Sequence, residues 1–224
     1  MAKKKDWKEA ELIQTFHLER IATHQTPLMT EWLTVEHPKF TNSESEIFEK
    51  IYRKAVEKIG GWSEEDLKMK FISFVLELGD LTDDKNVVTF FDKQLKGIVE
   101  GISLSVKSDF MLAKGFMNIY QTPYFHFQAG GVPQYKPQIN PSGEPMAQLI
   151  EAFLIAQEQN SQSGMEIPLY GCEIIGKQWC FVTMERKQYC ISSIYDCTNR
   201  EELLQIIAIL RKFKSILNDR FLGD

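Results

Sequence analysis

The sequence predicts an α+β (mixed α/β) fold with a central mixed sheet flanked by helices. Three observations lead to this prediction. Apolar residues recur at helical spacing in four segments, branched and aromatic residues concentrate in two blocks between those segments, and glycines punctuate the blocks. The resulting order is helix, helix, strand meander, helix, two or three strands, helix, which is typical of one sheet covered by helices.

Length and composition set the domain organisation. The chain has 224 residues, 43% hydrophobic and 25% charged, which suits one well-buried core. Residues 1–42 contain Pro27, Pro38 and only a weak helical pattern, so we expect an N-terminal helical appendage followed by a core domain over 43–224. The net charge of -5 provides no global basic field, so any nucleic-acid binding would need a local basic patch.

Two helices open the core domain. The first runs to the pair Gly60-Gly61, where glycine stops a helix. The second begins at Ser63, three residues before Asp66, a capping-box arrangement that places acids at the positive end of the helix dipole. One apolar stripe of this second helix predicts that it packs on the sheet.

Strands follow from about residue 87. Residues 87–128 predict a meander of three or four strands, in which His126 lies between two phenylalanines and is expected to form structural hydrogen bonds. An amphipathic helix begins near Met146, and three short strands with tight turns come after it. Thr198 and Glu201 predict a capping box for the last helix.

The cysteines and the apolar runs indicate the compartment. The four cysteines lack the paired spacing of zinc ribbons and are expected to be buried free thiols. The N-terminus turns polar where the apolar core of a signal peptide would follow, and no apolar run approaches the roughly 20 residues that cross a bilayer. We therefore expect a cytoplasmic protein without a membrane partner.

Asp109 and Lys136 are the strongest candidates for chemistry. Asp109 lies in "SVKSDFMLAKG" and Lys136 in "QYKPQ", in strands that are expected to be adjacent. Hydrolysis of a phosphodiester needs carboxylates that hold Mg²⁺, and a nearby lysine orients water and offsets developing negative charge. An Asp and a Lys on exposed strands are also common without any such role.

Several stretches resemble the PD-(D/E)xK nuclease-like superfamily. They include "GWSEEDLKMKFISFVLEL", "KSDFMLAKG", "PYFHFQ", "QYKPQ" and "PMAQLIEAFLIAQEQN", and more narrowly they are similar to a group of uncharacterised bacterial proteins of Bacteroidetes type. The similarity runs from about residue 44 to 214. It implies a restriction-endonuclease-like core and Mg²⁺-dependent cleavage of nucleic acid, DNA binding included, in restriction or defence.

The resemblance also implies site residues. Asp109 matches the metal-binding aspartate, and Lys136 matches the lysine of the acidic-x-Lys triplet. Glu65, or the neighbouring Glu64, matches an acidic residue of the first core helix, and Gln148 matches a polar position that faces the site. Asp109 and Glu65 are the metal ligands that this comparison implies.

Gln134 departs from the superfamily pattern, which has a glutamate immediately before "YK". The chain reads "FQAGGVPQYKPQ", as though a small loop had been inserted there. An amide oxygen carries no formal charge, so metal affinity should fall, and the neutral Gln128 would not restore it. The alternative function is therefore a non-catalytic relative that serves as a protein-interaction or nucleic-acid-binding module.

The appendage carries aromatic residues that suit packing. Trp7, Phe16 and Trp32 predict either a homo-oligomer formed through residues 1–42 or packing back onto the same domain.

Overall fold

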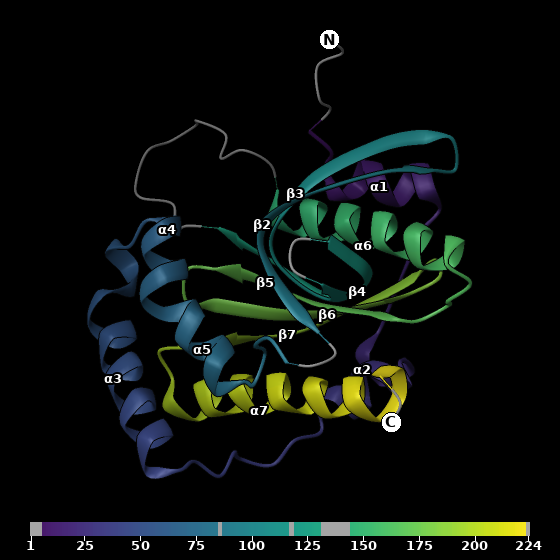
Figure 1. Ribbon diagram of the computed structural model, residues 1–224. Coiled ribbons are helices and arrows are strands. Elements are labelled where there is room, and N and C mark those ends of the chain that lie inside the picture. Colours follow the sequence, from purple (N-terminus) through teal and green to yellow (C-terminus); the bar gives the residue numbers. More distant parts are fainter. Residues whose placement is uncertain (1–5, 85–86, 117–118, 131–143, 223–224) are drawn as a thin grey trace.

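The computed structural model describes residues 6–84, 87–116, 119–130 and 144–222. Its centre is a seven-stranded mixed sheet in the order β1-β7-β6-β5-β4-β3-β2, with helices on both faces (Figure 1), which confirms the predicted α+β class. The strands are β1 (Glu19–Ile21), β2 (Val88–Val99), β3 (Ile102–Phe116), β4 (Ile119–Gly130), β5 (Leu169–Ile175), β6 (Gln178–Glu185) and β7 (Gln188–Asp196).

The helices form two layers. Helix α6 covers one face of the sheet together with α1, and α2 to α5 and α7 cover the other (Figure 1). The helices are α1 (Glu9–Phe16), α2 (Pro27–Leu33), α3 (Asn42–Lys58), α4 (Glu64–Leu67), α5 (Ser73–Leu78), α6 (Pro145–Gln162) and α7 (Arg200–Leu217), with short turns η1 (Thr23–Gln25), η2 (Ile59–Gly61), η3 (Lys68–Ile72) and η4 (Asn218–Leu222).

The strand connections follow the predicted order. β2, β3 and β4 form an antiparallel meander of three strands, and α6 then crosses over so that β5 pairs parallel to β4. The β2–β3 turn places Glu100 and Gly101 at φ 50° and 82°, and positive φ at both turn residues matches the twist of a tight hairpin. β1, which pairs parallel to β7, was not among the predicted strands.

The β2–β3 hairpin branches away from the sheet. β3 pairs with β2 from Ile102 to Ala113, but its pairing with β4 begins only at Phe110. The part of the hairpin before Phe110 extends over α6 (Figure 1), where Leu95 and Leu104 are buried in the α6 layer. Asp109 lies where the two pairings separate.

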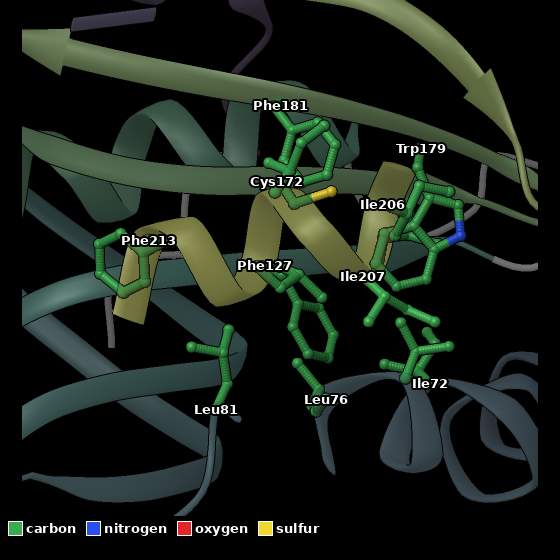
Figure 2. Close-up of a cluster of buried hydrophobic side chains, with 14 of the residues drawn as sticks. Ile72, Leu76, Leu81, Phe127, Cys172, Trp179, Phe181, Ile206, Ile207 and Phe213 are labelled. Atoms are coloured by element: carbon green, nitrogen blue, oxygen red, sulfur yellow. The ribbon is translucent and has the colours of Figure 1, made fainter. Parts of the chain in front are cut away.

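One core fills the space between the sheet and α5 and α7. Figure 2 shows Ile206, Ile207 and Phe213 of α7 close to strand residues that include Phe127, Cys172 and Phe181. Full burial of a side chain of this size stabilises the fold by about 1.5–3 kcal/mol.

The aromatic residues of the appendage pack on their own chain. Trp7 and Phe16 belong to the α6 core, and Trp32 is fully buried in the α7 core, where its Nε1 donates to the Ile209 carbonyl at 2.8 Å. This is the second of the two arrangements expected from the sequence. The domain boundary after residue 42 stays a prediction.

The structure confirms the predicted helix cap at Ser63 and corrects the one predicted at Thr198. Ser63 Oγ accepts the Asp66 N–H at 3.1 Å, as predicted. The prediction for the last helix was wrong, because Asn199 rather than Thr198 caps α7, with its Oδ1 accepting the Glu201 N–H at 3.0 Å. Asn is at least as good a cap as Thr, and the Thr198 hydroxyl bonds Asp196 instead.

Two further predictions concern the cysteines and the membrane. All four cysteines are buried free thiols, as predicted. Among the described residues, the helices are too short or too polar to span a membrane.

Candidate functional site

Asp109 is a buried carboxylate with both oxygens engaged. Its side chain is 5% exposed. Oδ1 accepts a hydrogen bond from Lys68 Nζ at 2.6 Å, and Oδ2 accepts one from the Ala129 N–H at 2.9 Å. The carboxylate therefore joins the start of the helical segment α4–α5 to strand β4.

Gln128 completes the backbone hydrogen bonding where β3 leaves β4. Its Oε1 accepts the Asp109 N–H at 2.9 Å, and its Nε2 donates to the Lys107 carbonyl at 3.1 Å and to Gln148 Oε1 at 2.8 Å. Buried backbone groups need partners, and a branching strand loses those that its neighbour would supply. The Gln128 amide is thus committed to holding the branch together.

Lys68 lies among three carboxylates. Its Nζ is 2.6 Å from Glu64 Oε1, 2.6 Å from Asp109 Oδ1 and 3.8 Å from Asp92 Oδ1. Asp92 in turn pairs with Lys107 at 2.9 Å. We call these five residues the Lys68 cluster.

The surroundings of Lys68 and Asp92 in the Lys68 cluster favour the charged forms of both side chains. Burial by itself would lower the pKa of Lys68, but the hydrogen bonds and charges of Asp109 and Glu64 outweigh it, so that the pKa is raised. The hydrogen bond from Lys107 lowers the pKa of Asp92, helped by the charge of Lys68. Lys68 and Asp92 are therefore ionised at neutral pH.

The structure brings some of the predicted site residues together around Asp109 and places others elsewhere. Asp109 is central, and Gln148 reaches it through Gln128. Glu64 belongs to the Lys68 cluster, whereas Glu65 is exposed on the first helical turn. Gln134 and Lys136 lie outside the described residues.

Sequence reasoning missed Lys68 and Glu173. A Glu64–Lys68 pair at i, i+4 looks like an ordinary pair on a helix surface, so its spacing gave no sign of the third partner. Glu173 of β5 pairs in register with Gln128 of β4, and burial raises its pKa, with Glu9 and Glu144 adding negative charge nearby. Only knowledge of the β4–β5 register could have placed it beside Gln128.

His126 is a structural residue. It is fully buried beside Phe153, and its Nδ1 is 3.2 Å from Ser108 Oγ. Burial lowers its pKa to about 3, so the ring stays neutral at physiological pH. This setting agrees with the structural role expected from the sequence.

The donors around Asp109 do not fit a divalent-metal site in their present arrangement. Within the described ranges, no group of three or more His, Cys, Asp or Glu side chains is placed to hold a metal ion. The carboxylates of the Lys68 cluster surround an ammonium, and the neighbouring Gln128 carries no charge. Mg²⁺ and Ca²⁺ are held mainly by carboxylate, carbonyl and water oxygens that are free to coordinate.

Comparison with known proteins adds no family. No protein-family model matches the chain, and no curated protein matches it. The resemblance to PD-(D/E)xK nucleases stays a prediction.

Proposed function

We propose that this chain is a PD-(D/E)xK-like domain that no longer catalyses metal-dependent hydrolysis and acts as a nucleic-acid-binding module. One observation carries the proposal: both oxygens of Asp109 are engaged, one by the Lys68 ammonium and the other by the Ala129 N–H. On the resemblance of its motifs, the module would belong to restriction or defence.

The chemistry of the neighbouring groups supports the loss of catalysis. Metal-assisted hydrolysis needs a cation that activates water and stabilises the developing charge. Gln128, on the strand beside Asp109, offers a neutral amide whose oxygen already accepts the Asp109 N–H. The Glu64 carboxylate beside Asp109 is engaged by the Lys68 ammonium, which occupies the place that Mg²⁺ would need between the two carboxylates.

The outward face of the β2–β3 hairpin supports nucleic acid as the ligand. Gln94 pairs with Lys107 across the two strands, and Lys96 pairs with Ser105. Lys96 and Lys107 are exposed, and so is Ser103 further along the hairpin. Lysine, serine and glutamine side chains are common donors to phosphate oxygens. The positive charge that an acidic chain needs to bind nucleic acid comes here from Lys96 and from Lys107, which also pairs with the exposed Asp92.

Fluorescence anisotropy with labelled single- and double-stranded DNA and RNA oligonucleotides tests the proposal. The double variant Lys96→Glu/Lys107→Glu should bind at least about ten-fold more weakly than the unchanged protein at low salt, because phosphate contacts dominate such binding. Lys50→Glu/Lys58→Glu, on exposed positions of α3, is the matched control. Equal loss in both variants, or no binding by the unchanged protein, would contradict a site on the hairpin.

A Mg²⁺-dependent nuclease is the second candidate. Glu64 and Asp109 each place an oxygen 2.6 Å from the same Lys68 nitrogen, so two carboxylates already converge on one cationic group. Cleavage of labelled DNA or RNA with Mn²⁺, lost in Asp109→Ala, would favour this candidate. Cleavage that appears only in Gln134→Glu would indicate a catalytic centre that the natural sequence has disabled.

The cytoplasm is the compartment that we propose. Four cysteines remain as thiols, which is the usual state in a reducing compartment.

A further inference from the structure

Lys68 has the surroundings of a bound cation. Two carboxylate oxygens, Glu64 Oε1 and Asp109 Oδ1, lie 2.6 Å from its nitrogen, and Asp92 Oδ1 lies 3.8 Å away. These oxygens come from helix α4 and from the two strands of the β2–β3 hairpin. The side chain of Lys68 is only 18% exposed.

The helix that carries Lys68 changes its geometry at this residue. Helix α4 ends at Leu67, the π-helical turn η3 spans Lys68–Ile72, and α5 resumes the α-helix. A π turn is rare and often marks a functional position, because it inserts one residue and redirects the side chains before and after it. Here it begins at the residue that crosses to Asp109.

Charge balance in the Lys68 cluster depends on the same residue. Three carboxylates face two ammonium groups, and the Lys107 ammonium pairs with Asp92. If Lys68 lost its charge, Glu64 and the buried Asp109 would lie near one another without a cation between them. Uncompensated buried charge is strongly unfavourable, so the cluster would need another cation.

We propose that Lys68 is the resident cation of this carboxylate site and that its ammonium excludes divalent and trivalent ions. The inference rests on the proposed loss of metal-dependent catalysis and identifies the group that maintains it. The 2.6 Å spacing around the nitrogen lies at the upper end of the 2.3–2.6 Å range of calcium–oxygen bonds. A hard cation of that size could therefore replace the ammonium once Lys68 is shortened or neutralised.

Terbium luminescence, with calcium competition, tests this inference. Lys68→Met ends the side chain one atom before the position of the ammonium and removes its charge, and it should bind Tb³⁺ at least about ten-fold more tightly than the unchanged protein. Lys70→Met is the matched control, because Lys70 also pairs with a carboxylate four residues earlier but lies on the exposed side of the helix. The double variant Lys68→Met/Asp109→Asn should lose the gain.

Each outcome separates the alternatives. No gain in a folded Lys68→Met, or an equal gain in Lys70→Met, overturns the role of Lys68 and leaves the proposed function standing. Tight binding by the unchanged protein that Asp109→Asn abolishes overturns the proposed function itself. Circular dichroism checks folding, and Lys68→Gln, which can still donate to Asp109, replaces Lys68→Met if that variant does not fold. Lys68→Gln should show the same gain, and its absence overturns the inference.

Discussion

Lys68 and Lys70 lie two residues apart on one helical segment, and their surroundings differ sharply. Each pairs with the carboxylate four residues before it, Lys68 with Glu64 at 2.6 Å and Lys70 with Asp66 at 2.5 Å. Lys70 is half-exposed and forms no other ion pair within the described chain, whereas Lys68 also contacts Asp109 on β3. The i, i+4 spacing in the sequence therefore does not show whether an ion pair stays on the helix surface or also contacts a distant strand.

The difference follows from solvent exposure. Exposed ion pairs contribute little because water competes for both charges, whereas breaking a buried pair leaves a charge that nothing compensates. The Lys68 cluster should therefore respond strongly to substitution, and the Lys70–Asp66 pair should hardly respond.

The largest effect is expected for Asp109→Ala. This change leaves Lys68 without its buried partner and the Ala129 N–H without an acceptor, so the free energy of unfolding should fall by about 3 kcal/mol. Urea denaturation measures it, with Asp66→Ala as the exposed counterpart. Similar losses in both variants would remove the distinction between the two regions.

Gln128→Ala should have the next largest effect. Three groups lose the hydrogen bond that Gln128 provides, namely the Asp109 N–H, the Lys107 carbonyl and Gln148 Oε1. We expect a loss of about 2 kcal/mol together with faster amide exchange at the hairpin branch. Hydrogen exchange that stays unchanged near Asp109 would show that Gln128 does not hold the branch.

A smaller effect on the stability of the fold is expected when the pH is lowered and Asp92 becomes protonated. Lys107 lowers the pKa of Asp92, so this carboxylate stabilises the fold above its unfolded pKa, near 3.8, and the contribution is lost as pH falls below that value. Because Asp92 is well exposed, the contribution should be less than about 1 kcal/mol. Asp92→Asn should flatten the fall in stability between pH 5 and pH 3, and an unchanged slope would argue against this pairing.

The smallest effect is expected for Lys70→Met. Within the described chain, the Lys70 ammonium pairs with Asp66 alone, and both side chains are exposed to solvent, so the urea midpoint should not change measurably. A clear loss of stability would mean that the exposed pair contributes as the buried one does.

The features that could be predicted from the sequence pattern all depend on local sequence. The helices and strands of the core domain, the buried cysteines and the cap at Ser63 depend on residues close together in the sequence, and the structure confirms them. Asp109 was also singled out as a candidate, because it lies in a predicted strand and matches the metal-binding aspartate of the PD-(D/E)xK pattern.

The parts that could not be predicted depend on contacts across long stretches of chain. β1 has three residues, too few for a strand pattern, and gains its partner only when β7 is in place. Lys68 reaches β3 from the first residue of the π turn η3, and Gln128 bonds backbone groups at the point where the hairpin branches. Neither feature leaves a local signal in the sequence.

Calorimetric titration of the unchanged protein with Mn²⁺ tests the central claim most directly. With Lys68 and the Ala129 N–H engaging both oxygens of Asp109, we predict no saturable binding at millimolar Mn²⁺ and no cleavage of labelled DNA or RNA under the same conditions. Saturable binding and cleavage that both disappear in Asp109→Ala would contradict the account and identify an active metal-dependent nuclease.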